Sequence, residues 1–167
     1  MNITEAKQQF IQNWGVFGSN WGINRTMAQI HALLLISPEP LNADEVMEEL
    51  QISRGNVNMN LRELMNWGIV DKVLRAGERK EYFEAEKDIW KVAMRIMKER
   101  KKRELDPIIQ AMEAIKDVED KKDAETKAFL ETVTQIQKFA KQADGALAGL
   151  IKADQNWFTG TLLKLFK

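Results

Sequence analysis

The fold is decided by residues 42–86, which read NADEVMEELQISRGNVNMNLRELMNWGIVDKVLRAGERKEYFEAE. The stretch opens on an asparagine, a residue type that caps helices, and a short helix is predicted over Ala43–Leu50. Gln51–Ser53 then forms a tight turn. A second helix is predicted over Arg54–Trp67.

A short hairpin follows the second helix, which ends at Gly68. Strands are predicted over Ile69–Arg75 and Glu81–Glu86, joined by the loop Ala76–Lys80, in which Gly77 supplies a positive φ. Helix, turn, helix and hairpin in this order predict a winged helix-turn-helix, an arrangement that places one helix in a DNA groove.

The second helix has one apolar stripe and one polar face. Val57, Leu61 and Leu64 recur at helical spacing. A shared core is expected from these and four further positions, Val46, Leu50, Ile52 and Ile69. The opposite face carries Gly55, Asn58, Met59 and Arg62, flanked by Arg54 and Asn56. An ordinary solvated face is the alternative reading of this pattern.

The polar face favours base reading, because Asn and Arg match the edges of adenine and guanine in the major groove. Asn56, Asn58 and Asn60 stand at alternate positions, and because asparagine is a poor helix former, helix propensity does not explain their presence. Arg75, Arg79 and Lys80 surround the hairpin loop and suit phosphate or minor-groove contact, or else form a solvated turn. The predicted DNA contacts are Ser53, Arg54, Asn56, Asn58, Asn60, Arg62, Arg75, Arg79 and Lys80.

Five runs of sequence closely resemble the GbsR-type branch of the MarR transcriptional regulators. They are WGINRT at 21–26, LLISPEPL at 34–41, SRGNV at 53–57, NLREL at 60–64 and GERKEYF at 77–83. The resemblance covers roughly Phe10 to Glu104 and is specific, because separate runs match in order and spacing. It implies a homodimeric bacterial or archaeal repressor with a winged-helix DNA-binding domain, and some members of the branch respond to choline or glycine betaine.

Charge is distributed unevenly along a chain whose formal net charge is zero. Residues 1–52 hold 2 Lys/Arg against 6 Asp/Glu, residues 53–103 hold 14 against 8, and residues 104–167 hold 9 against 11. The positive segment is the one that contains the second helix and the hairpin. Local charge decides whether phosphates are attracted, so DNA binding is compatible with a neutral chain.

Composition excludes several classes of protein. At 167 residues the chain fits one domain, or a small domain with a dimerisation extension. It has no cysteine, no apolar run long enough to cross a membrane and no signal sequence, so we expect a cytoplasmic protein with no membrane partner.

The remaining chain reads as helical, which makes the expected fold mainly α with a small β-hairpin. Residues 1–22 are expected to form an N-terminal helix that contributes to dimerisation, with its core at Thr4–Phe17. Residues 23–87 form the winged helix-turn-helix domain, beginning with a helix over 24–36 that the Ser37–Pro40 segment ends. Residues 88–167 form a helical dimerisation region with an apolar tail.

Four features stand out in this helical region. The basic run 95–103 is either a solvated face or a contact to the DNA backbone. Asp106-Pro107 predicts a break or kink, with Asp106 as the cap of a new helix. A charged turn is expected at 119–123. A heptad-type seam, which Asp144-Gly145 is expected to interrupt, packs on a partner chain or folds back within its own chain. The seam consists of Phe129, Val133, Ile136, Ala140, Ala143, Leu147 and Leu150.

The apolar tail over residues 156–167 is too short to span a bilayer. Docking into the dimer interface is expected for it, with an interfacial membrane helix as the alternative. We expect no enzyme, cofactor or metal site, because the single histidine, His31, lies among apolar residues and no glycine-rich phosphate loop is present.

Aromatic residues raise the question of a ligand. Trp14, Phe17, Trp21 and Trp90 are candidates for holding a quaternary ammonium effector through cation–π attraction, and core aromatics are the alternative. The sequence therefore predicts a homodimeric repressor that binds a double-stranded DNA operator and is relieved by a small molecule. The rival hypothesis is a winged-helix scaffold for protein interaction without specific DNA binding.

Overall fold

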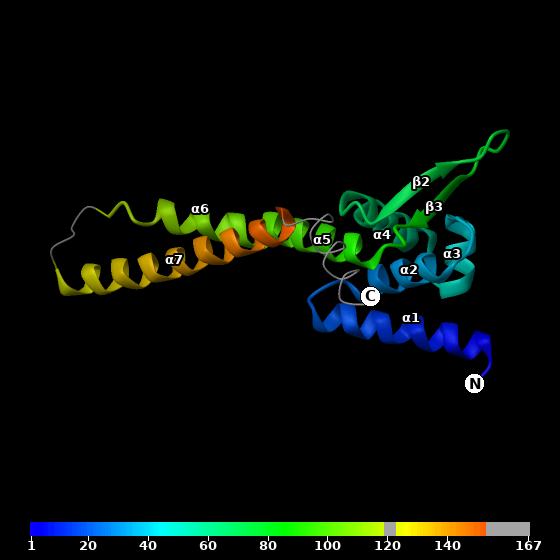
Figure 1. The fold of residues 1–167 in the computed structure, drawn as a ribbon, viewed down its shortest axis with the longest axis horizontal. Coiled ribbons are helices and arrows are strands. Elements are labelled where there is room, and N and C mark those ends of the chain that lie inside the picture. Colours follow the sequence, from blue (N-terminus) through cyan, green and yellow to red (C-terminus); the bar gives the residue numbers. More distant parts are fainter. Residues whose placement is uncertain (119–122, 153–167) are drawn as a thin grey trace, which may run out of the picture. The chain divides into compact units, whose positions relative to one another are not determined.

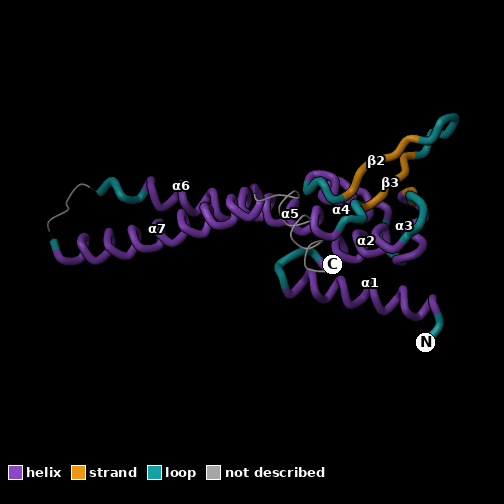
Figure 2. The backbone as a smooth tube through the Cα atoms, viewed as in Figure 1, coloured by secondary structure: helices purple, strands orange, loops and turns teal. Residues whose placement is uncertain are grey.

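The computed structural model describes residues 1–118 and 123–152, which belong to two compact units, Met1–Arg95 and the segment from Ile96 onward. Figure 1 colours the chain along its sequence, and Figure 2 colours it by secondary structure. They are α1 (Ile3–Asn20), α2 (Arg25–Ile36), β1 (Leu41–Asn42), α3 (Ala43–Leu50), α4 (Arg54–Asn66), β2 (Val70–Leu74), β3 (Glu81–Ala85), α5 (Ile89–Arg100), the π-helical turn η1 (Lys101–Leu105), α6 (Asp106–Ala114) and α7 (Ala124–Lys152). The predicted mainly α winged helix-turn-helix fold is confirmed.

Side-chain caps explain where the two central helices begin. The Asn42 side chain accepts the N–H groups of Asp44 and Glu45 at 2.9 and 3.1 Å, and the Glu45 carboxylate accepts the Asn42 N–H at 2.7 Å. The Ser53 hydroxyl caps α4 by accepting the Asn56 N–H at 3.3 Å. These caps satisfy donors that a helix leaves free, so both predicted starts are confirmed.

The described residues form one antiparallel sheet with the strand order β1-β3-β2. Val70 faces Ala85 and Leu74 faces Glu81 across the hairpin. The first predicted strand is therefore shorter by one residue at each end, and the second by one residue at its C-terminal end. The sequence analysis missed β1, in which Leu41 pairs with Phe83, because two residues are too short to show a strand pattern.

The core of the first unit surrounds α2. Its most completely buried side chains come from α2, α3, α4 and β2, and are Ile30, Leu34, Val46, Val57, Leu61, Leu64 and Val70. The expected α4 stripe is therefore confirmed as core, whereas Leu50 and Ile52 are only half-buried. Burial of this stripe turns the opposite face of α4 outward.

Helix α1 packs closely along α2 in the same unit. It extends three residues past the predicted end at Phe17, and its buried residues are Gly15 and Gly18. A Cβ at Gly18 would lie 2.6 Å from the Cβ of Ala28, so only glycine allows this approach. Lys87, just after β3, donates to the carbonyls of Leu34, Leu35 and Ser37 at 2.7–2.9 Å and satisfies the end of α2.

The chain does not break at Asp106-Pro107 and Asp106 is not a cap, but the helix is irregular directly before these residues, at the π-helical turn Lys101–Leu105, and α6 begins at Asp106. Asp106 has helical φ and ψ of −59° and −43° and makes no side-chain cap, and its carboxylate instead accepts from the Lys101 ammonium at 2.9 Å. The wider π-helical turn leads directly into α6, with Pro107 in the first turn, where a missing N–H costs little.

Helix α7 lies antiparallel to α6 and is continuous through Gly145, so the predicted interruption there is wrong (Figure 1). One interior glycine costs about 1 kcal/mol, and Asp144 pairs with Lys101 at 2.7 Å. Val133, Gln137 and Ala140 are buried, so this part of the seam packs within its own chain. Phe129 and other seam positions stay exposed.

The predicted charged turn at 119–123 reaches the described residues only at Asp123, which caps α7 by accepting the Thr126 N–H at 2.8 Å. The apolar tail at 156–167 lies outside the described residues. Within the described ranges, no helix is long and apolar enough to cross a membrane.

Candidate nucleic-acid interface

The outward face of α4 consists of side chains suited to DNA contact. Arg54, Gly55, Asn58, Met59 and Arg62 are exposed, as the helical spacing predicted. A Cβ added at Gly55 would meet no atom within 4 Å, so the backbone of the first turn is open to solvent. The face therefore offers donors and acceptors on a helix that its buried stripe fixes in orientation.

The three alternate asparagines do not share this face. Asn60 is only 3% exposed, and its amide donates to the backbone and side-chain oxygens of Asn56 at 2.8 and 2.7 Å. Residues two apart on a helix point in nearly opposite directions, so Asn58 lies apart from the other two. We therefore leave Asn60 out of the interface, and Asn56 is half-buried with its side-chain oxygen in use.

The hairpin, or wing, holds its cations in different ways. The Arg75 guanidinium lies 4.0 Å from the centre of the Tyr82 ring and 4.0 Å from the Glu39 carboxylate. The Tyr82 hydroxyl donates to Glu78, and this hydrogen bond raises the pKa of Tyr82. Arg75 is thus tied to the base of the wing, while Arg79 is exposed in the loop.

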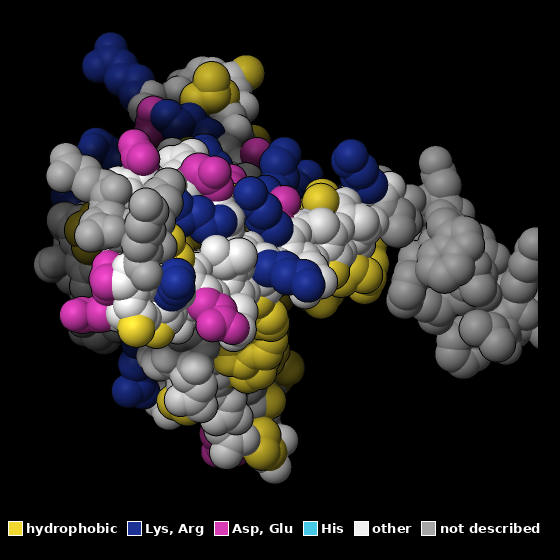
Figure 3. Space-filling view, turned by 90° about the vertical axis from the view of Figure 1, so that its left-hand side faces the viewer, with side chains coloured by type: hydrophobic (Ala, Val, Ile, Leu, Met, Phe, Trp, Pro, Cys, Tyr) yellow, Lys and Arg dark blue, Asp and Glu magenta, His cyan; other side chains and the backbone are white. Residues whose placement is uncertain are grey.

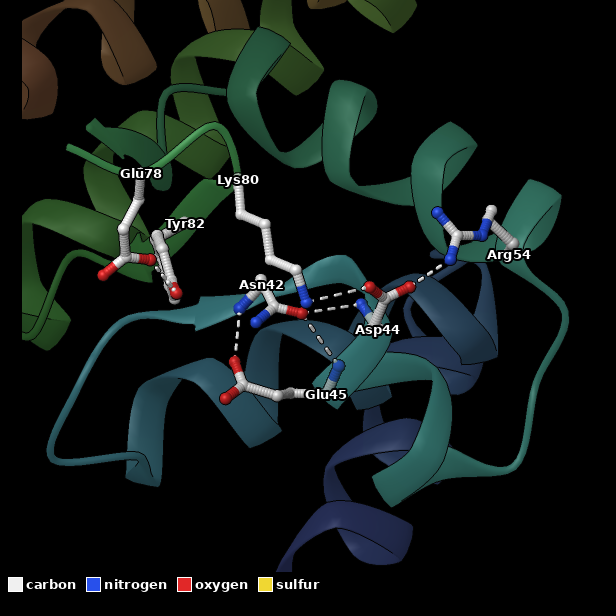
Figure 4. A network of polar contacts seen from close by, with 7 residues as sticks. All are labelled: Asn42, Asp44, Glu45, Arg54, Glu78, Lys80 and Tyr82. Carbon is white, nitrogen blue, oxygen red and sulfur yellow. Dashed lines mark hydrogen bonds and ion pairs between the residues drawn. The ribbon is translucent and has the colours of Figure 1, made fainter. Parts of the chain in front are cut away.

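Asp44 connects the wing to α4. Its carboxylate forms an ion pair with Arg54 and a second one with the Lys80 ammonium at 3.4 Å (Figure 4). Sequence reasoning missed Asp44, since an acidic residue in the first turn of a helix is common and its partners lie 10 and 36 positions away.

The basic run that follows is largely paired within the described residues. Arg95 donates to the Gly68 carbonyl at 2.5 Å and pairs with Glu86 at 3.4 Å. Arg100 and Arg103 pair with acidic residues one helical turn away, at 3.0 and 2.8 Å. These contacts agree with the reading of the run as a solvated face.

The aromatic candidates form a row along α1. The ring centres of Trp14 and Phe17 are 6.0 Å apart, and those of Phe17 and Trp21 are 5.4 Å apart. Rings packed this closely leave no space for a cation between them, so a cation could contact only the outer faces of the row. Trp90, the fourth candidate, belongs to α5, and its indole nitrogen is buried.

His31 packs under this row, with its ring centre 6.1 Å from that of Trp14. Burial, followed by the nearby Lys87 charge, lowers its pKa from 6.5 to about 4. The imidazole is therefore neutral at physiological pH. Among the described residues, no group of three or more His, Asp or Glu side chains is arranged to hold a metal ion.

Comparison with known proteins places this geometry in a family. Residues 21–81, which include α2, the helix-turn-helix and most of the wing, match the model of the MarR family. Residues 21–81 thus form a MarR-family domain. The match begins at the first of the sequence runs that resemble the GbsR-type branch and covers both elements of the candidate interface.

Two curated proteins to which the chain is similar come from Bacillus subtilis strain 168. The HTH-type transcriptional repressor GbsR is 29% identical over 66% of the chain and 61% of its own length. The putative HTH-type transcriptional regulator YvaV is 24% identical over 53% of the chain and 50% of its own length. The aligned part of the chain thus spans between half and two thirds of each relative.

A solved structure described as a transcriptional regulator shares the fold. It has a TM-score of 0.55 and 19% sequence identity, and the match covers 86% of this chain and 98% of the other. The fold shared with this solved structure thus extends well beyond residues 21–81, which the family model matches.

Proposed function

We propose that this chain is a sequence-specific regulator that binds double-stranded DNA, and that it acts as a homodimeric repressor. The observation that carries the proposal is the exposed polar face of α4 beside a wing with cationic side chains. Similarity to GbsR, which is named as a transcriptional repressor, supports the same function.

Two kinds of DNA contact follow from the exposed side chains. Asn58 and Arg62 read base edges, because both are exposed on the outward face and have the donor geometry for adenine and guanine. Arg79 and Lys80 on the wing contact phosphates. Ser53 already caps α4, so it contributes through the N–H groups and the dipole at the start of that helix.

A selection from random DNA with the full-length protein, followed by gel-shift measurements, tests this division. Arg62→Ala should lose about 1–3 kcal/mol on the selected sequence and relax its base preference. Arg79→Ala should weaken binding to every sequence alike and reduce the logarithmic salt slope by about 1. If no sequence is enriched and no shift appears at low salt, the scaffold hypothesis replaces DNA regulation.

The proposed dimer uses the N-terminal helix, residues 1–22, and the C-terminal region, residues 88–167. Apolar side chains that the described residues leave uncovered support it, and some appear as yellow surface in Figure 3. On α7 these are Phe129, Ile136, Phe139 and Leu150, and on α1 they include Val16 and Phe17. An apolar face of this kind on a helix is typical of an interface with another copy.

Mass measurement by light scattering tests the dimer. Ile136→Glu should convert the dimer to monomer, because it places a charge in the uncovered stripe. Gln135→Glu, at an exposed polar position one residue away, is the matched control and should stay dimeric. A dimer that persists in Ile136→Glu contradicts the use of this stripe.

The proposed function includes a quaternary ammonium effector that contacts Phe17 and Trp21. Phe17 and Trp21 are 52% and 57% exposed, so their outer faces are open to a quaternary ammonium ligand. Calorimetry of the dimer with choline and with glycine betaine tests this, with Trp21→Ala as the comparison. Absence of binding for both compounds removes a quaternary ammonium effector from the proposed function.

A further inference from the structure

The carboxylate of Asp44 takes no part in the cap at the start of α3. The helix is already capped by the reciprocal hydrogen bonds of Asn42 and Glu45, and Asp44 contributes only its backbone N–H to that cap. Its carboxylate points away from the cap toward two cations, as Figure 4 shows. A negative charge in the first turn favours the helix dipole, but that effect does not require the two ion pairs of Asp44, which call for a separate explanation.

The two cations belong to the two parts of the proposed DNA interface. Arg54 is the first residue of α4, and Lys80 is at the end of the wing loop. Their side chains are 63% and 60% exposed, while that of Asp44 is 34% exposed. A half-buried carboxylate thus neutralises part of the charge on two otherwise solvated side chains and holds them toward the same point.

Resting on the proposed DNA-binding function, we propose that Asp44 is a specificity-determining residue that suppresses binding to non-operator DNA. Any phosphate that approaches Lys80 or Arg54 must compete with the carboxylate and is repelled by it. Non-specific binding depends almost entirely on such phosphate contacts, so it bears the full effect of this competition.

The operator complex responds differently to the same residue. Asp44 holds Arg54 and Lys80 in one relative position, which favours the single register in which the α4 face meets its bases. Its repulsion of phosphates and its positioning of the cations oppose one another in that complex, whereas only the repulsion acts on loosely bound DNA. Asp44 therefore increases the ratio of specific to non-specific affinity.

The test compares Asp44→Asn with the wild-type protein on two duplexes by fluorescence anisotropy. One duplex is the sequence most enriched from a random pool by the wild-type protein, and the other has the same composition in scrambled order. Freeing the equivalent of one phosphate contact should raise affinity for the scrambled duplex about eightfold at ~0.1 M salt, from a slope of about 0.9 per phosphate. Operator affinity should change less, so the specificity ratio falls.

Glu49→Gln is the matched control, because it removes one exposed charge from the same helix without touching either cation. It should leave the ratio close to that of the wild type. Equal effects of the two variants on the scrambled duplex would reduce Asp44 to a contribution to net charge and overturn the proposal. Loss of affinity for both duplexes in Asp44→Asn would also overturn it.

A second measurement keeps Asp44 intact. Arg79 and Lys80 are neighbours on the wing, and among the described residues only Lys80 is within 4 Å of a carboxylate. Lys80→Gln should therefore cost less affinity for the scrambled duplex than Arg79→Gln does, and equal costs would contradict the proposal. Failure of the proposed function itself looks different, since the wild-type protein would then bind neither duplex.

Discussion

Replacing Asn42 by alanine should destabilise the first unit and, with it, the start of α3. The substitution removes the acceptor for two N–H groups, those of Asp44 and Glu45, at a position that is only 7% exposed. A helix cap is worth about 0.5–2 kcal/mol, and donors left unsatisfied in a buried site fall at the upper end. We expect a loss of about 2 kcal/mol in the free energy of unfolding.

Asn2→Ala is a control that the chain itself supplies. Asn2 and Glu5 form the same kind of reciprocal cap at the start of α1, with hydrogen bonds of 2.9 and 3.0 Å, at an exposed site. Water replaces the lost partner there, so we expect a cost of about 0.5 kcal/mol.

Urea denaturation followed by tryptophan fluorescence measures both variants, because four of the five tryptophans lie within Met1–Arg95. A cost for Asn2→Ala equal to or larger than that for Asn42→Ala would refute the reasoning that burial sets the value of this cap.

Three further predictions concern the core, the buried histidine and the helix contacts. Leu61→Ala should cost about 2–5 kcal/mol in urea denaturation because Leu61 is 1% exposed, whereas Met59→Ala, 60% exposed on the same helix, should change stability by about 0.5 kcal/mol or less. The pKa of His31 is lowered from 6.5 to about 4, so the unfolded chain binds a proton below pH 6.5 that the folded chain refuses until about pH 4. The contribution of neutral His31 to the free energy of unfolding is thus fully present above pH 6.5 and falls by up to about 3 kcal/mol toward pH 4. When unfolding is measured at both ends of this range, His31→Gln should lose less stability than the wild-type protein. Gly18→Ala should lower the melting temperature and cost about 1–3 kcal/mol in the free energy of unfolding, because the added Cβ would overlap a neighbouring side chain. Gly145→Ala has open space around it and should raise the free energy of unfolding by about 0.5–1 kcal/mol. Equal shifts in melting temperature for the two variants would contradict this account of the α1 contact.

The sequence by itself determined the winged helix-turn-helix and most of its core. Asn42 and Ser53 mark helix starts through local hydrogen bonds, and Val57, Leu61 and Leu64 show helical spacing. Such signals lie within one or two turns of chain, so they can be recognised without knowing what packs against them. The outward position of Arg62 followed directly from the buried stripe.

Helix geometry also predicts that the three asparagines of α4 do not share one face, although their common residue type suggests that they do. Asn56, Asn58 and Asn60 were grouped because asparagine suits base recognition, yet the 100° step of a helix separates Asn58 from the other two. The burial of Asn60 was therefore accessible from spacing alone.

Only the tertiary structure decided which charges meet and which apolar faces are covered. Asp44 meets Arg54 and Lys80 because the turn after α3 and the return of the hairpin bring positions 10 and 36 residues apart together. In the second unit, packing of α7 on α6 covered Val133 and left Ile136 open, a choice that the heptad pattern allowed in either direction. Which charges pair and which apolar faces are covered depends on contacts between residues distant in sequence, and these contacts cannot be predicted from local pattern and propensity.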